Sequence, residues 1–375
     1  MAHAYTPGLK VLHHTKVKKN RRLPIKGKIT KQVGDLLKPG DVVATTDLPG
    51  NVQMLKIANL LNIGPADVPD VMLVKEGDKV DKGQMIAETE GLFGFFKSDV
   101  KSPIDGTVEA ISDVTGQIVM REAPIPVEVD AYMSGTVKEI IPDEGVIVEA
   151  DAAFIQGIFG IGGESRGTME ILVDNREQEL TTDLLNESHK GKIVVGGSFV
   201  SLETYKKALS LQIAGIVVGG FNYYDLEEIL GYTLGVAITG SEDLVTSLIV
   251  TEGFGNIRMG TRTFDLLNKE NGKFVSINGA TQIRAGVIRP EIVIPLQESE
   301  IPETTVHKSD DRGIGEGSLV RIIRAPYFGK MGEVVSLPPE LQQMESETMV
   351  RVAEVKIDND VLSIPRANLE MVETD

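Results

Sequence analysis

The chain lacks cysteine and tryptophan entirely, and it contains no long apolar run. The absence of cysteine excludes disulfides, thiolate metal ligands and thiol nucleophiles. No apolar stretch approaches the roughly 20 residues that a membrane-spanning helix needs. The opening sequence MAHAYTPGLKVLHH also lacks the apolar core of a secretory signal. We therefore expect a soluble, cytoplasmic protein with no membrane span.

Negative charge is missing from the N-terminus, although the whole chain carries a net charge of −17. Residues 1–34 contain no Asp or Glu, and their many Lys and Arg side chains predict a basic N-terminal arm. Such an arm can contact nucleic acid, or it can fold back onto the acidic surface of its own chain. The second interpretation is favoured, because the rest of the chain supplies abundant carboxylates. The first would use Lys18, Lys19, Arg21 and Arg22.

A chain of 375 residues is long enough for two or three domains with separate cores. Two short patterns recur in residues 34–155. The first pattern, at 34–40 and 77–83, is a Gly-Asp pair followed by a spacer and by a glycine that opens a strand. The second pattern is Gly-Thr-Val, which opens a strand at 106–108 and at 135–137. Glycine and aspartate in these places are typical of tight turns between strands. We therefore predict an all-β domain over residues 35–155.

The stretch VMLVKEGDKVDKGQMIAETEG, followed by VKSPIDGTVEAIS, resembles the barrel-sandwich hybrid family. That family includes the biotinyl and lipoyl carriers, whose small β-fold is called a hammerhead, and the similar unit of the C subunits of electron-transport complexes. The resemblance implies a modified lysine on a tight turn before the SP-x-x-GTV stretch. Phe95 occupies that place here, and the nearest lysine, Lys97, is displaced toward Pro103. We expect no covalent biotin or lipoate and predict no other cofactor.

An aromatic cluster, GLFGFF at residues 91–96, stands where the attachment site would be. Its two glycines indicate a loop rather than a regular strand. Phe93, Phe95 and Phe96 can fold inward and fill the sandwich, or they can form an exposed apolar tip that binds a partner protein. The sequence leaves these two interpretations open.

Residues 156–296 show the alternation of strands and helices that indicates an α/β domain with a mostly parallel sheet. The expected strands are apolar on both sides, as a sheet with two covered faces requires. We expect strands at 193–195, 216–220, 235–240, 274–278 and 291–295, and helices at 201–212, 223–232 and 241–255.

Glycines end three of these strands, at Gly196, Gly197, Gly219, Gly220 and Gly240. Ligands of parallel sheets bind beyond such strand ends, where backbone N–H groups can hold an anion that Arg258 and Arg284 could clamp. Equally, the glycines can allow close packing of strand and helix, and the arginines can form structural ion pairs, which we favour for them. The histidines show no metal-ligand pattern, and we predict no metal site and no catalytic residue.

The polar, charged stretch 297–316 is predicted to be a linker. Residues 317–375 resemble the KOW motif of transcription and ribosomal proteins, which forms a small SH3-like barrel. The resemblance implies contact with RNA or protein, and Arg321, Arg324 and Lys330 are the side chains available for RNA phosphates. The many carboxylates of this segment make a protein contact or a packing role at least equally favoured.

The sequence thus predicts a mixed multi-domain protein with a barrel-sandwich hybrid, an α/β domain and an SH3-like barrel. The favoured function is a non-catalytic scaffold or adaptor that joins protein partners in a larger cytoplasmic assembly. The first alternative is an RNA- or ribosome-associated factor that uses the basic arm and the KOW-like barrel. The second is an enzyme or ligand-binding protein with its site at the glycine-rich strand ends. A homo-oligomer is left open.

Overall fold

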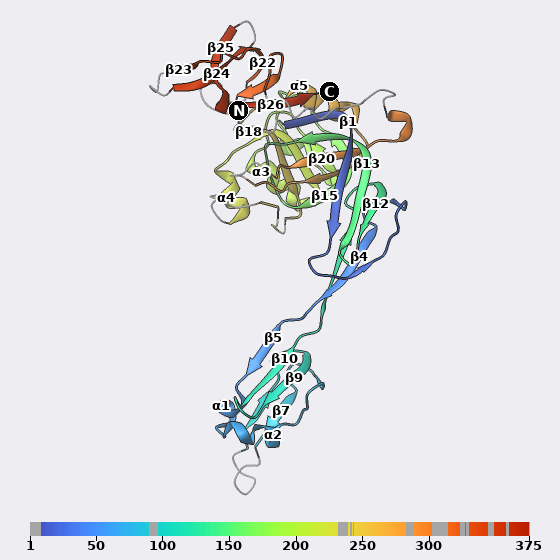
Figure 1. Cartoon of the computed structure of the whole chain (residues 1–375), viewed down its shortest axis with the longest axis vertical. Helices are drawn as coiled ribbons and strands as arrows, with labels where there is room; N and C mark the ends of the chain where they lie inside the picture. Colours follow the sequence, from blue (N-terminus) through green and yellow to red (C-terminus); the bar gives the residue numbers. More distant parts are fainter. Residues whose placement is uncertain are drawn as a thin grey trace.

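The computed structural model shows a mostly β protein with several sheets and few helices (Figure 1). No helix in the part of the chain that the structure describes is long and apolar enough to cross a membrane. The described residues are 9–89, 97–231, 239–240, 242, 244–282, 288–301, 314–322, 327, 330–343, 349–357 and 360–374.

The first β unit combines two separate stretches of the chain, residues 9–48 and 125–156, and is called the outer copy. Its buried core includes Val43, Tyr132 and Val148. Its strands are β1 (Leu9–Arg22), β2 (Lys28–Ile29), β3 (Leu36–Leu37), β4 (Val42–Leu48), β11 (Ile125–Asp130), β12 (Gly135–Ile141) and β13 (Gly145–Gln156).

The second β unit, called the inner copy, is formed by residues 52–121 and lies at the far end of the molecule (Figure 1). Its core closes on itself, since the cluster around Ile86 and Met120 contains only residues of this unit. Its elements are β5 (Val52–Leu55), α1 (Ile57–Leu61), α2 (Val68–Val71), β6 (Lys79–Val80), β7 (Met85–Glu88), β8 (Asp99–Lys101), β9 (Gly106–Ser112) and β10 (Gln117–Arg121).

The two copies share one hydrogen-bond pattern, which explains the repeated Gly-Asp and Gly-Thr-Val motifs. In the outer copy, the Gly34 N–H donates to the Val137 carbonyl over 2.8 Å, and in the inner copy Gly77 donates to Val108 over the same distance. The aspartate after each glycine accepts a bond from the same valine. Both glycines have φ near +90°, at +93° and +90°, a backbone conformation that favours glycine.

The hairpin beside each turn carries the same bulge. In the outer copy, β4 pairs with β11 and Val43 is skipped in the register; in the inner copy, β7 pairs with β8 and Ile86 is skipped. Both skipped side chains are completely buried, so each bulge directs an apolar residue into its core. Shared turns, register and bulges identify the two units as copies of one fold.

The copies are nested rather than consecutive. The outer hairpin does not close with a short turn, because the chain leaves it at Leu48 and returns at Ile125. The inner copy fills that insertion, and its first and last strands, β5 and β10, pair with each other. Figure 1 shows it projecting from the outer copy on two adjacent runs of chain. The β region predicted at 35–155 therefore consists of two units.

Residues 9–22 form strand β1, so the prediction of a basic arm is wrong for them. β1 pairs antiparallel with β13 from Val11 to Arg22, and its first residues pair parallel with β26. Leu9, Val11 and Val17 are buried, while cations occupy positions between them. A count of charges does not show that apolar and cationic residues alternate along this strand. The alternation lets the apolar face pack while the lysines stay near water.

Residues 156–296 contain a sheet with parallel and antiparallel pairs. β15, β16, β17 and β18 form three parallel pairs in that order, and β14, β19 and β20 add antiparallel pairs. The strand predicted at 235–240 lies largely outside the described residues, and the others predicted here are confirmed. The elements are β14 (Phe159–Ile161), β15 (Glu164–Ile171), β16 (Ile193–Val195), α3 (Leu202–Ser210), β17 (Gly215–Phe221), α4 (Asp225–Leu230), β18 (Ser247–Phe254), α5 (Thr261–Lys269), β19 (Phe274–Asn278) and β20 (Glu291–Pro295).

The helix predicted at 241–255 is wrong, because strand β18 occupies most of that stretch. β18 lies inside the sheet between β17 and β14, and all but its last residue are buried. A strand covered on both faces has no polar alternation, so its apolar run cannot be told from a buried helix by periodicity. The helix predicted at 201–212 is confirmed as α3, and Ser201 caps it by accepting the Thr204 N–H.

The C-terminal strands form a separate, largely antiparallel unit that adjoins the central sheet (Figure 1). Its core contains Val320, Val334 and Val355. Its likeness to an SH3-like barrel stays a prediction. The strands are β21 (Leu319–Ile322), β22 (Met331–Ser336), β23 (Leu341–Gln343), β24 (Met349–Ile357), β25 (Asp360–Pro365) and β26 (Leu369–Thr374).

Substitution of the equivalent glycines Gly106 and Gly135 tests whether the two copies have separate cores. A Cβ on Gly106 would lie 2.3 Å from the Arg121 carbonyl oxygen, and a Cβ on Gly135 would lie 2.6 Å from that of Glu149. We expect either substitution by alanine to lower the free energy of unfolding by about 1–3 kcal/mol, because overpacking forces backbone shifts. Hydrogen exchange should locate the loss in the inner copy for Gly106→Ala and in the outer copy for Gly135→Ala.

Gly40→Ala is the matched control, since the nearest atom to its Cβ would be a side-chain nitrogen of Arg166 at 3.9 Å. It should leave the free energy of unfolding unchanged. Loss of protection in both copies after Gly106→Ala would contradict the separation of the cores.

Candidate functional site

The hairpin of β7 and β8 lies toward the free end of the inner copy (Figure 1). Lys97 lies just before β8, in the segment that connects the two strands of this hairpin, and its Nζ lies 3.0 Å from the Glu88 carboxylate, with 54% of its side chain exposed. The ion pair joins this lysine to the last residue of β7. Phe93, Phe95 and Phe96 lie outside the described residues, so partner binding by them stays a prediction.

The four N-terminal cations considered for RNA contact face carboxylates of their own chain. This confirms the interpretation that the basic segment contacts the acidic surface of the protein. Each of the four cations is therefore partly neutralised by a neighbouring carboxylate. The pairs are Lys18 with Glu149 at 3.3 Å, Lys19 with Glu291, Arg21 with Glu164 at 2.8 Å, and Arg22 with Glu144 at 3.3 Å.

Lys19 and Arg21 also reach a buried tyrosine where the outer copy meets the central sheet. The Lys19 nitrogen and the Arg21 guanidinium carbon lie 5.8 and 5.4 Å from the ring centre of Tyr132, within cation–π range. The Tyr132 hydroxyl donates to Glu291 over 3.2 Å. Burial raises the pKa of Tyr132 well above its usual value, and the carboxylates of Glu291 and Glu164 add to this shift. The residue holds φ at +66°, a strained conformation that the surrounding packing maintains.

Arg321 is buried, so the prediction that it contacts RNA is wrong. Only 2% of its side chain is exposed. Its guanidinium donates to Glu252 on β18 and to Glu370 on β26, each over 2.9 Å. Arg289 also donates to Glu370. These alternating charges join the C-terminal unit to the central sheet.

The remaining charged candidates do not converge on one described site. Arg258 is exposed in the loop after β18. Lys330 is exposed, and its Nζ lies 6.0 Å from the ring centre of Tyr327. Arg284 and Arg324 lie outside the described residues, so their roles stay predictions.

Neighbouring atoms crowd the glycines at the strand ends. A Cβ on Gly219 would lie 2.2 Å from the Ile257 carbonyl oxygen, and a Cβ on Gly220 would lie 1.9 Å from that of Gly255. The loop after β18 therefore occupies the space beside these strand ends. Close packing accounts for the glycines without a ligand. Similar crowding is found at Gly196, Gly197 and Gly240.

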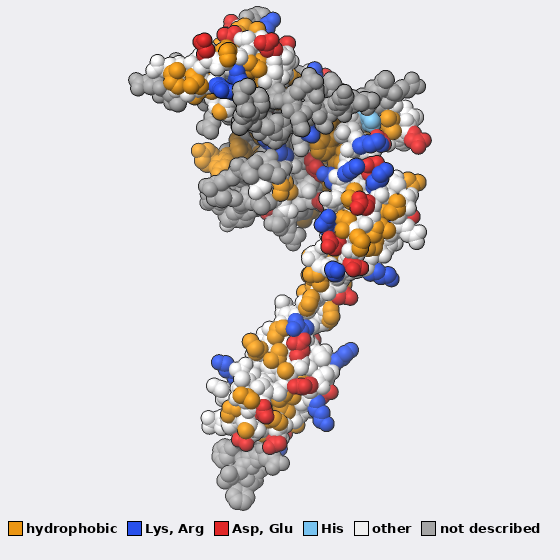
Figure 2. Space-filling view, in the orientation of Figure 1, with side chains coloured by type: hydrophobic (Ala, Val, Ile, Leu, Met, Phe, Trp, Pro, Cys, Tyr) orange, Lys and Arg blue, Asp and Glu red, His pale blue; other side chains and the backbone are white. Residues whose placement is uncertain are grey.

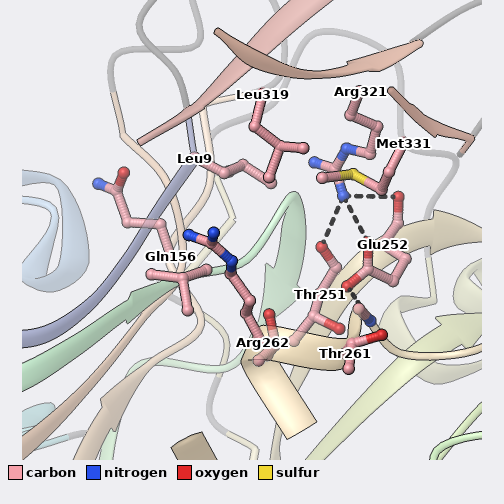
Figure 3. Close-up of a pocket in the computed structure, with 12 residues that line it drawn as sticks. Leu9, Gln156, Thr251, Glu252, Thr261, Arg262, Leu319, Arg321 and Met331 are labelled. Carbon is pink, nitrogen blue, oxygen red and sulfur yellow. Dashed lines mark hydrogen bonds and ion pairs between the residues drawn. The ribbon is translucent and has the colours of Figure 1, made fainter. Parts of the chain in front are cut away.

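A cavity of about 230 Å³ opens where the C-terminal unit meets the central sheet (Figure 3). It is bounded by the start of β1, by β18, by the first turn of α5 and by β21 and β22. Glu252, Arg262 and Arg321 contribute the charged groups of its lining. The buried Nε of Arg321 has no hydrogen-bond acceptor among the residues that the structure describes. The cavity thus borders the buried charge network of Arg321, whereas the Nε itself is enclosed by protein atoms.

Sequence reasoning missed this cavity, because its walls come from distant parts of the chain. One usable signal was Arg321 itself, which stands between the apolar residues Val320 and Ile322. A cation within an apolar run needs buried carboxylates if the run folds inward. The sequence does not show which of its many carboxylates would meet it.

Residues 64–132 match the family model of the RnfC barrel sandwich hybrid domain. The match covers most of the inner copy and continues through β11 of the outer copy. Among curated proteins, none matches the chain. The resemblance to the barrel-sandwich hybrid family is confirmed, and the chain contains such a domain. The KOW resemblance of the C-terminal unit stays a prediction.

Removing the centre of the buried network should cost more stability than removing an exposed ion pair. Arg321→Leu leaves the carboxylates of Glu252 and Glu370 buried without their shared cation, so we expect the free energy of unfolding to fall by about 3–5 kcal/mol. Lys206→Ala breaks the exposed pair with Glu228 and should change it by about 0–1 kcal/mol. Urea denaturation measures both values, and equal losses would contradict a structural role for the network.

Proposed function

We propose that the protein is a non-catalytic scaffold that presents the inner copy of its barrel-sandwich fold to a partner protein. The match to the RnfC domain supports a place in an electron-transport-related complex. These 375 residues contain no cysteine, so they hold no cysteine-ligated iron–sulfur cluster. The protein's own contribution is a contact surface held away from its body.

The observation that carries this proposal is the difference between two equivalent edge strands. In the outer copy β1 pairs antiparallel with β13, and in the inner copy β5 pairs antiparallel with β10 in the equivalent position. In the outer copy, residues 18–21 read Lys-Lys-Asn-Arg, and the three cations pair with carboxylates. In the inner copy, the equivalent residues 52–55 read Val-Gln-Met-Leu, with Val52 44% and Met54 62% exposed.

An edge strand offers unpaired N–H and C=O groups to any other strand, and lysines on the edge discourage such pairing. The outer copy has these lysines. Within the described ranges, β5 pairs on one side only, with β10, and its side chains carry no charge. An extended segment of a partner can therefore pair with β5 and cover Val52 and Met54. Figure 2 shows apolar side chains exposed on the two adjacent runs of chain that join the copies and on the inner copy.

The two alternative functions have less support. An RNA-binding surface needs unpaired cations, whereas Lys18, Arg21 and Arg321 pair with carboxylates. A ligand site at the glycine-rich strand ends needs open space, and neighbouring atoms occupy it. In a carrier, the resemblance implies a modified lysine at the position that Phe95 occupies here, and the nearest lysine, Lys97, pairs with Glu88.

Met54→Lys should release the partner. The substitution places a charge on the exposed edge of β5, where it opposes both strand pairing and apolar contact. We expect the amount of partner that co-purifies with the tagged protein from its native host to fall at least about tenfold (~1.4 kcal/mol). Quantitative mass spectrometry of the purified complex measures this loss.

Asn20→Lys is the matched control, because Asn20 stands opposite Ile147 in the outer copy as Met54 stands opposite Val119 in the inner copy. It should leave co-purification unchanged. Retention of the partner by Met54→Lys, or equal loss with both variants, would contradict the proposal. Light scattering of the purified protein distinguishes a second copy of this chain from a different partner.

A further inference from the structure

The outer and inner copies are joined by two short runs of chain, residues 49–51 and 122–124, which are called the stalk. The pairing of β4 with β11 ends on one side of the stalk, and the pairing of β5 with β10 begins on the other. Each run spans about 10 Å at the rise of a β-strand. These two runs alone carry the inner copy away from the body (Figure 1).

A link of this length can act as a flexible tether or as a stiff arm. A two-stranded ribbon is marginally stable by itself, so backbone pairing alone does not keep the stalk straight. Flexible tethers are typically rich in glycine and serine, whereas proline stiffens a linker. The two runs read Pro-Gly-Asn and Glu-Ala-Pro, with one proline in each. This composition favours the stiff arm at every position except Gly50.

The two prolines restrict the backbone of both runs. The rings of Pro49 and Pro124 fix φ near −65°. Each proline also confines the residue before it, Leu48 or Ala123, to extended conformations. The stalk therefore has few alternative backbone conformations through which it can bend.

Gly50 has the greatest intrinsic freedom in the stalk, and the opposite run confines it. The residue is buried between the runs. A Cβ at this position would lie 2.2 Å from the Glu122 carbonyl oxygen and 2.6 Å from that of Ala123. The glycine therefore lets the two backbones touch, and a rotation at this point would drive one run into the other.

Hydrogen bonds join the two runs and connect them to a third strand. The Glu122 N–H donates to the Asn51 carbonyl over 3.0 Å, and the Asn51 side-chain amide donates to the Glu122 carboxylate over 2.8 Å. The Arg121 guanidinium donates to the Gly50 carbonyl over 3.0 Å and to the Glu109 carboxylate over 3.1 Å. Because Glu109 belongs to β9, this arginine braces the stalk against the sheet of the inner copy.

We infer that the stalk is a stiff arm that holds the inner copy at a fixed distance and in a fixed direction from the body. Strand β5 then points in one direction before any partner arrives, which reduces the conformational freedom that binding removes. This use of the stiffness rests on the proposed function. The stiffness itself depends only on the contacts within the stalk.

Distances between two spin labels, measured by electron–electron double resonance, test the inference. These 375 residues contain no cysteine, so introduced cysteines are the only labelling sites. Leu36→Cys labels the outer copy and Val114→Cys the inner copy, at side chains that are 84% and 82% exposed. We expect a single distance distribution, as narrow as that of the reference pair Leu36→Cys and Lys206→Cys within the body. A flexible tether would broaden it at least about twofold, and that outcome would overturn the inference.

Glycines in place of both stalk prolines should loosen the arm. Pro49→Gly with Pro124→Gly frees the backbone, while the separate cores of the two copies stay intact. The distribution between the labels on the two copies should broaden at least about twofold. Pro142→Gly is the matched control, since Pro142 lies in the turn between β12 and β13, outside the stalk. Equal widths for the stalk variant and this control would show that the stalk does not set the direction of the inner copy.

Arg121→Ala tests the brace, because it removes the bonds to Gly50 and Glu109. It should also broaden the distribution, whereas Lys97→Ala, which breaks an exposed ion pair away from the stalk, should not. Equal widths for these two variants would contradict the brace. All distances are measured on the purified chain without a partner. A narrow distribution together with partner retention by Met54→Lys would therefore contradict the proposed function and leave the stiff arm in place.

Discussion

The antiparallel pairing of β1 with β13 is the interaction on which the rest of the structure depends. It extends from Val11 opposite Ile155 to Arg22 opposite Gly145. On its other edge, β13 pairs first with β12 of the outer copy and then with β20 of the central sheet. One strand therefore passes from the first unit into the second. This shared ladder makes a continuous support from which the inner copy projects.

Nested duplication gives one fold two different surroundings. The cores of the two copies are alike, since Val43 and Ile86 are the bulged residues at equivalent places. Val137 and Val108 make the same backbone hydrogen bonds to the equivalent turns. Their surfaces differ, because the outer edge strand carries ion-paired cations and the inner one carries exposed apolar groups. Packing constrains the buried positions in both copies, whereas the edge of each copy reflects what lies beside it.

Buried charge marks both junctions of the body. Where the outer copy meets the central sheet, Lys19 and Arg21 lie against the ring of Tyr132. Where the C-terminal unit meets the central sheet, Arg321 donates hydrogen bonds to two carboxylates. Buried ion pairs are sensitive to the loss of one partner, so each junction tolerates few arrangements of its two sides. The second junction differs in enclosing a cavity of about 230 Å³.

The sequence by itself determined the repeated turns, the barrel-sandwich fold and the exclusion of thiol chemistry, because glycine conformation, short-range alternation and composition are local properties. It did not determine that β18 is a strand, that residues 9–22 join a sheet, or which carboxylates meet Arg321. Those outcomes depend on contacts between distant segments. Only the tertiary structure decided that one copy is inserted into the hairpin of the other, since pairing between strands far apart in the chain leaves no local signal.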